Sequence, residues 1–249
     1  MGRGFSNNRK QFISSPNNIN VNYEPVTQIR QTRVNYQKID GVTNVWAPAM
    51  IWESAIPPEM CKLIIKKAEE TQELIEDSVY SRREDSNERV TRNNRVRNTS
   101  SYTTQDLWIN LFATGWILEA NRQMYNYDLS KYDREPTCII SKYTDRDNSF
   151  FAPHVDFGVE KESGLHTRKL SLSMQLSSEY EYEGGELLLY YHHQSSKIDG
   201  KPVQNEFLVP KSLGTVVVFD SRVVHEVTPI TRGTRHALIK WYHGDTPLR

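Results

Sequence analysis

The pattern of short strands divided by turns that begins at Thr137 is the strongest constraint on the fold of this chain. Residues 170–176 alternate apolar with polar side chains, and this period of two predicts a half-buried strand with one polar face. Residues 215–219 form a continuous run rich in β-branched side chains, which is typical of a strand buried on both faces. Further strands are expected at 186–191 and 235–242. Short strands at regular spacing predict a β-sandwich or jelly roll.

Two helices are expected before these strands. The pair Pro57-Pro58 suits the first turn of a helix with one apolar face, which should end near Leu74. Thr103 stands three residues before Asp106 and is a plausible cap for a second helix that includes residues 108–120. Helices followed by strands predict an α+β chain.

The other segments are more polar. Residues 1–44 show a period of neither 2 nor 3.6 and are interpreted as a flexible or peripheral arm, which leaves residues 45–249 as one domain. Residues 45–52, VWAPAMIW, are expected to be extended on the core. Six arginines stand between residues 79 and 101, either in a solvated loop or in a lid that meets an extended substrate.

The charges give no global attraction to a polyanion. The 31 basic and 31 acidic residues cancel, so neither nucleic acid nor an anionic membrane is an expected partner. No apolar run approaches the roughly 18 residues of a membrane span. The first residues lack a secretory h-region, and two cysteines, Cys61 in a helix core and Cys138 in a strand core, are too few for a disulfide framework. A cytoplasmic protein is expected, in the host cytoplasm if the source is viral.

The triplet His154-Val155-Asp156 offers an imidazole and a carboxylate on one face of a strand, because residues i and i+2 share a face. About one such triplet is expected by chance in this composition, so an ordinary surface pair is the alternative. A metal site needs a third ligand from another strand. The candidates are His166, His192, His193, His225, His236 and His243.

His225 is favoured among them because Arg235 follows ten residues later, beyond a turn with Pro229 and Gly233. In that geometry the strand bearing Arg235 returns beside the strand bearing His225. Two histidines and one carboxylate form the facial triad of non-haem Fe(II) oxygenases, which leaves three positions for a 2-oxo acid and O2. The distal carboxylate of 2-oxoglutarate needs a cation, and the planar fork of arginine suits it best. A surface arginine at a turn is the alternative for Arg235.

The sequence also resembles the Fe(II)- and 2-oxoglutarate-dependent dioxygenases of the prolyl 4-hydroxylase family, in particular its bacterial and viral members. The matching stretches are APHVDFG, RKLSLSMQL, YEGGELLLY, LGTVVVFDSRVVHEVTP and RGTRHALIKWYHG. The resemblance implies a double-stranded β-helix, or jelly roll, with supporting N-terminal helices. It also implies that Fe(II), 2-oxoglutarate and O2 take part, that ascorbate serves as reductant, and that succinate and CO2 are released as an unactivated C–H bond is hydroxylated.

The resemblance assigns roles to six residues. His154, Asp156 and His225 become the iron ligands, and Arg235 binds the distal carboxylate of 2-oxoglutarate. Tyr143 stands where the family has a tyrosine near the co-substrate, although packing in a strand explains it equally well. Trp241 shares a strand face with Arg235 and corresponds to a pocket position, although a core aromatic is equally consistent. A second anchor for the distal carboxylate is left open among Ser171, Ser173 and Gln175.

The substrate is less constrained than the chemistry. Proline in a peptide or protein is the first expectation, and a free amino acid or small molecule hydroxylated on the same fold is the alternative. Nucleic-acid demethylation is disfavoured, because that class has a second arginine six residues after the first, where this chain has Trp241. A jelly-roll binding module or virion component without activity is a further alternative. The oligomeric state is not predicted.

The remaining candidate residues receive ordinary interpretations. His192, His193 and His243 are expected in solvated loops, and His236 and Lys240 alternate away from the pocket face of their strand.

Overall fold

The computed structural model describes residues 30–33, 49–71, 74–77, 79–80, 92–93, 97–157, 167–198 and 201–246. No helix within these ranges is both long and apolar enough to cross a membrane. The elements in chain order are β1 (Arg30–Arg33), β2 (Ala49–Glu53), α1 (Pro58–Thr71), β3 (Ile75–Asp77), β4 (Val79–Tyr80), β5 (Arg92–Asn93), β6 (Arg97–Thr104), α2 (Leu107–Ala120), the π-helical turn η1 (Asn121–Tyr125), β7 (Cys138–Thr144), β8 (Phe150–His154), β9 (Thr167–Gln175), β10 (Tyr182–Gly184), β11 (Leu187–Ile198), β12 (Lys201–Leu208), β13 (Val216–Asp220), β14 (Val224–Val227) and β15 (Ile230–Gly244).

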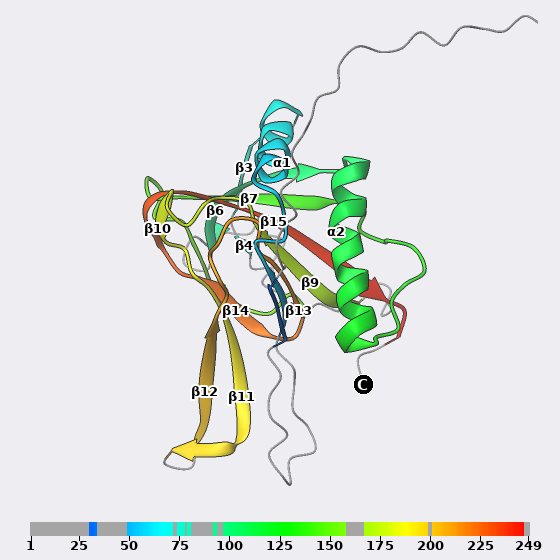
Figure 1. The fold of residues 1–249 in the computed structure, drawn as a ribbon. Coiled ribbons are helices and arrows are strands. Elements are labelled where there is room, and N and C mark those ends of the chain that lie inside the picture. Colours follow the sequence, from blue (N-terminus) through cyan, green and yellow to red (C-terminus); the bar gives the residue numbers. More distant parts are fainter. Residues whose placement is uncertain are drawn as a thin grey trace, which may run out of the picture.

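Most strands form two antiparallel sheets that share β6 (Figure 1). Residues 100–104 of β6 pair with β7 in the larger sheet, whose order is β1-β2-β13-β9-β15-β7-β6. Residues 97 and 98 pair with β8 in the smaller sheet, whose order is β6-β8-β14-β11-β12. An apolar cluster that includes Ile51, Val217 and Leu189 fills the space between the two sheets. This arrangement confirms the predicted jelly roll.

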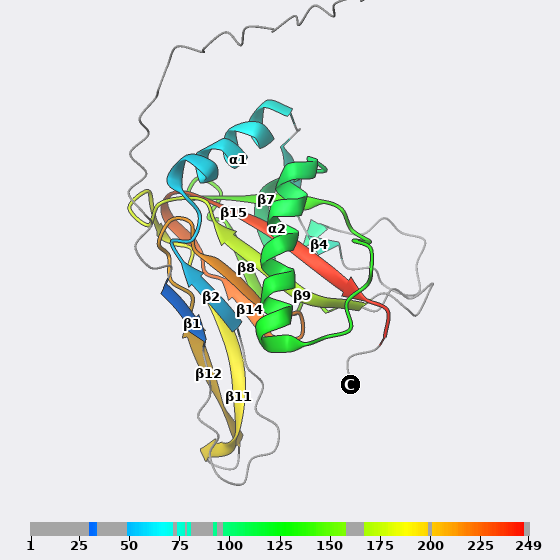
Figure 2. The ribbon, with the colours of Figure 1, turned by 45° about the vertical axis from the view of Figure 1, so that its right-hand side comes forward.

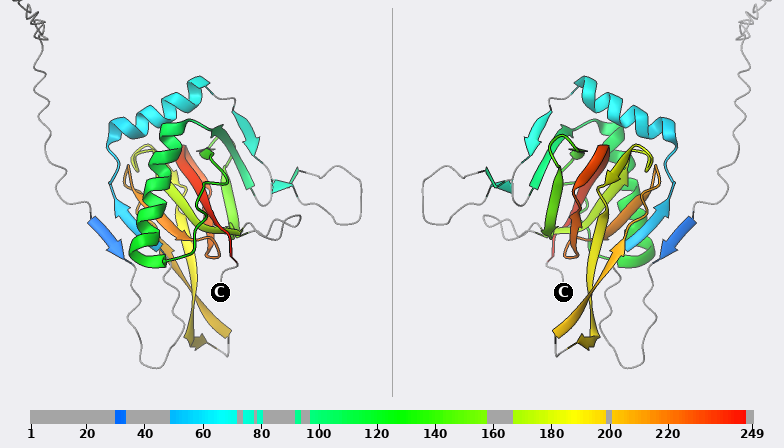
Figure 3. Two further views of the ribbon diagram at one scale, coloured as in Figure 1. Left: turned by 90° about the vertical axis from the view of Figure 1, so that its right-hand side faces the viewer. Right: turned by 90° about the vertical axis from the view of Figure 1, so that its left-hand side faces the viewer.

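Helices α1 and α2 cover the outer face of the larger sheet (Figures 2 and 3). The first buries Cys61, Ile64 and Ala68, and the second buries Ile109, Ala113 and Ile117, so each presents one stripe to the sheet. Both predicted helices are confirmed, although α1 ends at Thr71 rather than near Leu74. Cys61 and Cys138 are buried free thiols, as expected.

Thr103 does not cap the second helix. It lies in β6, where it pairs with Ile139 of β7, and α2 begins only at Leu107. Asp106 occupies the N-cap position without a side-chain capping bond, and its N–H donates to Thr104 Oγ1 at 3.1 Å. The prediction was wrong because the β6–β7 ladder extends through Thr103, so the chain enters the helix later.

Strands β13 and β9 differ in which residue types their two buried faces carry. Strand β13 is buried on both faces, as its β-branched run predicted. Strand β9 is not half-buried, because Ser171, Ser173 and Gln175 are only 1%, 6% and 6% exposed. Its leucines pack toward the helices, and its polar face lies between the two sheets. The alternation therefore marks an interior polar cleft rather than a solvated surface.

Some segments that were expected as loops or as an arm contain strands. Residues 30–33 pair with β2, and the rest of the predicted arm at 1–44 lies outside the described residues. Within 79–101, β4 pairs with β5 and Arg97 begins β6, whereas residues 81–91 and 94–96 are not described. His192 and His193 lie in β11 rather than in a loop, and the β11–β12 hairpin projects from the body (Figure 1).

Lys240 is fully buried on the face of β15 that points away from the cleft, which agrees with its predicted direction. Its ammonium lies 2.7 Å from Asp133 Oδ2 and donates to the backbone carbonyls of Glu135 and Thr137 at 3.0 and 3.4 Å. His243 was expected in a solvated loop, but it lies in β15 and is 9% exposed, with Nε2 3.7 Å from Glu135 Oε2. The loop before β7 supplies polar partners for both side chains, which is why strand β15 buries them.

Replacing Asp133 with alanine is expected to lower the free energy of unfolding by about 3 kcal/mol, because it leaves the Lys240 ammonium buried without a counter-ion. Urea unfolding measures this change. The matched control is Glu183→Ala, which breaks an ion pair with Arg232 in which both side chains are 60% exposed. That change should cost less than about 1 kcal/mol. Equal losses of unfolding free energy in the two variants would show that the buried ion pair contributes no more to stability than the exposed one.

Candidate functional site

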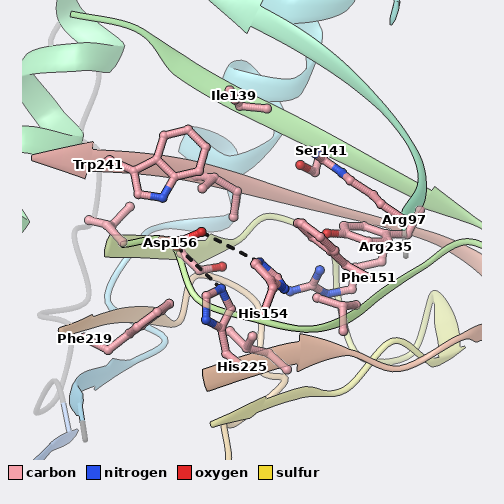
Figure 4. A pocket seen from close by; sticks show the side chains of 16 residues that line it. Arg97, Ile139, Ser141, Phe151, His154, Asp156, Phe219, His225, Arg235 and Trp241 are labelled. Atoms are coloured by element: carbon pink, nitrogen blue, oxygen red, sulfur yellow. Dashed lines mark ion pairs between the residues drawn. The ribbon is translucent and has the colours of Figure 1, made fainter. Parts of the chain in front are cut away.

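Three potential metal ligands meet where β8 and β14 pair. The register places His225 directly opposite His154, and Asp156 follows immediately after β8. Asp156 Oδ1 lies 3.7 Å from His154 Nε2, and Oδ2 lies 3.5 Å from His225 Nε2 (Figure 4). Within the described part of the chain this is the only group of three such side chains, and their ligand atoms all lie within 4.8 Å of one another.

The backbone fixes the tautomer of both histidines. His154 Nδ1 lies 2.8 Å from Ala152 O, and His225 Nδ1 lies 3.0 Å from Val223 O. A carbonyl oxygen only accepts hydrogen bonds, so each Nδ1 carries the proton and donates it. Both Nε2 lone pairs are then free and face Asp156, which is the arrangement that metal-ligating histidines adopt.

Aromatic packing fixes the ring planes. Phe151 stacks on His154 with centroids 3.5 Å apart and planes inclined by 16°, and Arg97 lies over the Phe151 ring with Cζ 4.7 Å from its centroid. Phe219 contacts His225 edge to face at 4.7 Å. The donor atoms are therefore oriented by packing before any ligand arrives.

The charge state of the cluster favours binding of a cation. Burial and then the neighbouring His225 lower the pKa of His154 to about 4, so its imidazole is neutral at neutral pH. Burial raises the pKa of Asp156, but His225, Trp241, His154 and Ser171 together outweigh burial and hold that pKa below its usual value. One carboxylate and neutral imidazoles are the donor set that Fe(II) takes in a facial triad.

A cleft of about 540 Å³ extends from the three ligands into the space between the sheets. The remaining residues that line it are Arg97, Ile139, Ser141, Tyr143, Phe151, Leu172, Ser173, Leu187, Phe219, Val227, Arg235, Ile239 and Trp241. Three of the predicted site residues, Tyr143, Arg235 and Trp241, thus share one cleft with the ligand cluster.

The route by which Arg235 reaches the cleft differs from the prediction. Strand β15 pairs with β7 and β9 in the larger sheet, whereas β14 pairs with β8 and β11 in the smaller one. The strands that bear His225 and Arg235 therefore do not lie side by side. The chain crosses from one sheet to the other between Val227 and Ile230, and the two side chains meet across the interior.

Arg235 is a buried cation with unused donors. It is 3% exposed, and within the described residues no carboxylate pairs with it. Its Nε donates to Gln175 Oε1 at 3.1 Å, while Nη1 is buried and finds no hydrogen-bond partner in the described part of the chain. Tyr143, its direct neighbour on β7, is 3% exposed, and its ring centroid lies 5.3 Å from Arg235 Cζ. A buried guanidinium with a free N–H calls for an anionic ligand.

Trp241 stands at the other end of the same strand face, beside the metal ligands (Figure 4). Its indole N–H is buried and has no hydrogen-bond partner at bonding distance, although it lies close enough to Asp156 to help lower the pKa of that carboxyl. Arg168 stacks on its ring, with Cζ 3.8 Å from the centroid, and is held 3.2 Å from Glu135.

Sequence reasoning missed the residues that support Asp156. Ser221 O accepts the N–H groups of Asp156 and Phe157 at 3.0 and 2.9 Å, and Ser221 Oγ lies 2.9 Å from Ser171 Oγ. The turn that carries Ser221 is fixed by Asp220, which pairs with Arg222 at 2.6 Å. The string FDSR before His225 was the available signal, but it does not say which distant loop the turn will hold.

His236 lies outside the cleft, as its alternation with Arg235 predicted. Burial, followed by the positive charges of Lys142 and Arg235, lowers the pKa of His236 to about 4. Its backbone N–H donates to Ser177 Oγ at 2.8 Å, and its Nε2 is buried without a partner.

This histidine should make the fold sensitive to acid. Between about pH 6.5 and 4 the unfolded chain takes up a proton at this position and the folded chain does not, so the stability that is present at neutral pH is lost as the pH falls. His236→Gln should therefore lose about 2 kcal/mol less than the wild type over this interval. Urea unfolding of both proteins at the two ends of the interval measures the difference. Parallel curves would show that another group causes the acid sensitivity.

The side chains fit both an iron ion and a 2-oxo diacid. The ligand cluster supplies two imidazoles and one carboxylate from one side, and Nη1 of Arg235, which has no hydrogen-bond partner among the described residues, lies in the same cleft. Of the three candidates for a second anchor, Ser171 is bonded to Ser221 near Asp156, and Gln175 contacts Arg235 itself. Ser173 lines the cleft between them.

A comparison with known protein families shows which family this chain resembles. The sequence profile described as the 2OG-Fe(II) oxygenase superfamily matches residues 138–243, a span that holds all three ligands, Tyr143, Arg235 and Trp241. This part of the chain is similar to the 2OG-Fe(II) oxygenase superfamily, which agrees with the chemistry predicted from the sequence.

Proteins similar in sequence include PKHD-type hydroxylases of bacteria. One from Maricaulis maris is 31% identical over 103 residues, which is 41% of this chain and 40% of that protein. One from Shewanella sp. strain ANA-3 is 32% identical over 94 residues, 36% of each chain. The aligned region thus spans about two fifths of the length of these relatives.

Two solved structures share the fold. A prolyl-4-hydroxylase of Pseudomonas putida superimposes with a TM-score of 0.55 at 17% identity, covering 80% of this chain and 94% of that one. A prolyl hydroxylase of Trichoplax adhaerens, in complex with a peptide fragment of the hypoxia inducible factor oxygen degradation domain, gives 0.56 at 15% identity, with 80% and 84% covered. At these identities the likeness establishes the jelly-roll architecture.

Proposed function

We propose that this protein is an Fe(II)- and 2-oxoglutarate-dependent dioxygenase that hydroxylates proline, or a related residue, in a peptide or protein. The observation that carries the proposal is the pairing, in one cleft, of a two-histidine, one-carboxylate cluster with a buried arginine that has no counter-ion within the described residues. When bound, Fe(II) and 2-oxoglutarate would supply the oxidising chemistry with O2 as the oxidant: one oxygen atom would enter the hydroxylated C–H bond and the other the succinate that forms as CO2 is released.

The chain's own residues bind and orient. His154, Asp156 and His225 hold the ion from the side of the smaller sheet, and Arg235 pairs with the distal carboxylate of the co-substrate. Apolar side chains such as Ile139 and Ile239, which line the cleft between the two ends, exclude water. No nucleophile or general base is required of the protein.

Two arginine–aromatic pairs beside the ligand cluster support a peptide substrate. Arg97 lies over the ring of Phe151, and Arg168 lies over the ring of Trp241. Each guanidinium carries five N–H groups, so it can bind a backbone carbonyl of an extended chain in addition to its present partners, Thr99 for Arg97 and Glu135 for Arg168. The names of the relatives, PKHD-type hydroxylase and prolyl hydroxylase, point in the same direction. Ascorbate as reductant and a cytoplasmic location complete the proposal.

Succinate release tests the substrate class. Fe(II), ascorbate and 2-oxoglutarate are supplied with a proline-rich peptide, with free proline, or with neither, and hydroxylation is read as a mass increase of one oxygen atom. Stimulation by the peptide alone supports the proposal, whereas stimulation by free proline alone assigns the small-molecule alternative. Failure to bind Fe(II) or Mn(II) at micromolar concentration in the presence of 2-oxoglutarate would overturn the oxygenase itself and favour a binding module.

A further inference from the structure

The tether that holds Arg235 has a fixed direction. Gln175 Nε2 donates to Ser177 O at 2.9 Å and to Tyr182 Oη at 2.8 Å. Since a carbonyl oxygen only accepts, the amide nitrogen must face Ser177, and Oε1 must face the opposite way, toward Arg235 Nε. Gln175 Oε1 thus accepts from Nε of Arg235 and leaves Nη1 of Arg235 available to the cleft.

A second, smaller pocket lies behind this tether. Its lining includes Gln175, Tyr182, Lys211 and Thr215, and it shares Ser173, Leu187 and Arg235 with the metal cleft. The guanidinium therefore stands between two spaces that adjoin each other. Gly185 borders the same point, with φ of +63°, and a Cβ there would come within 3.2 Å of Arg235 Cδ. The lack of a side chain at this position leaves the arginine room to shift.

Gln175 and Tyr182 hold the guanidinium among the described residues. Arg235 Nε donates to Gln175 Oε1, Tyr182 accepts from Gln175 Nε2 and interacts with Arg235 as well, and Tyr143 contacts Arg235 through its ring face. A flexible side chain that borders a second pocket can shift toward it when the Gln175 bond is removed. The distance from the metal ligands to the anion-binding end of the cleft therefore depends on Gln175.

We propose that Gln175 is a positioning residue that selects the 2-oxo diacid by chain length. By holding Arg235 forward, it makes the cleft fit the five-carbon 2-oxoglutarate and exclude the six-carbon 2-oxoadipate. Removal of the tether lets the guanidinium move toward the second pocket, so the shorter diacid loses its ion pair and the longer one gains space. This inference rests on the proposed function, because it assigns a role in binding the same co-substrate.

Binding measurements on Gln175→Met test the inference without turnover. Methionine has a similar volume but no strong acceptor for Nε. Isothermal titration calorimetry with Mn(II) in place of Fe(II) gives Kd for both diacids. We expect Kd for 2-oxoglutarate to rise about 10-fold, since a hydrogen bond to a charged group is lost, and the preference over 2-oxoadipate to fall by a similar factor. Tyr182→Phe removes one of the two bonds on Nε2 and should give a smaller change in the same direction.

The matched control is Met174→Leu, which alters the neighbouring residue of the same strand on its opposite, helix-facing side and conserves volume. It should leave both constants and their ratio unchanged. Wild-type preference in Gln175→Met would overturn the inference, and so would weaker binding of both diacids with an unchanged ratio, because that result indicates general damage. If the wild-type protein with Mn(II) binds no 2-oxoglutarate at all, the proposed function fails instead.

Discussion

Replacing Asp156 with alanine is expected to abolish 2-oxoglutarate-dependent succinate formation and to remove high-affinity binding of Mn(II). Asp156 is the only carboxylate of the ligand cluster, and both Nε2 atoms face it at 3.5 and 3.7 Å. Loss of an outer-shell partner of a metal ligand already costs roughly 10- to 100-fold, so loss of the ligand itself should exceed about 100-fold in metal affinity. Calorimetric titration with Mn(II) measures it directly.

Val155→Ala is the matched control for this change. Val155 stands between the two ligands, but its side chain is 45% exposed and does not line the cleft. This variant should bind Mn(II) and turn over as the wild type does. An Asp156→Ala protein that keeps wild-type Mn(II) affinity would show that the ion binds elsewhere.

Replacing Arg235 with methionine should produce two opposite effects. Binding of 2-oxoglutarate should weaken by at least about 100-fold, because truncating one partner of a buried charge pair costs several kcal/mol. Without co-substrate, the variant should unfold at the same temperature as the wild type or a higher one, since it removes a buried cation that has no counter-ion within the described residues. Calorimetry measures the first effect, and thermal unfolding with and without 2-oxoglutarate measures the second.

Arg235→Lys separates charge from geometry. It keeps a cation but loses the planar fork and the bond to Gln175 Oε1, so its affinity should fall between those of the wild type and the methionine variant. A methionine variant whose melting temperature still rises in 2-oxoglutarate as much as that of the wild type would contradict the assigned role.

The site residues that could be predicted are those that residue type and spacing along the sequence are enough to identify. His154 and Asp156 share a strand face by alternation, and the interval from His225 to Arg235 placed a cation near the third ligand. The path between them was predicted wrongly, because local sequence does not say to which sheet a strand returns. Residues 227–230 take the chain from the smaller sheet to the larger one, so β14 and β15 are not neighbouring strands of one sheet.

Residues whose role depends on partners far away in the sequence were harder to predict. Strand β9 was expected to be half-buried, because alternation reports that one face is polar and not what covers it. Ser171 and Gln175 acquire their roles from Ser221 and Arg235, at positions 50 and 60 residues away. His243 is buried because Glu135 lies beside it. These contacts are products of the tertiary fold.

The division of the site between two sheets has a consequence for how such an enzyme diversifies. The metal ligands come from the smaller sheet, and the residues that face the organic co-substrate come from β9 and β15 of the larger one. Changes on the larger sheet therefore alter which acids are accepted without touching the ligands. Substitutions on the larger sheet can thus change the acid that is bound while the metal-ligand set stays constant.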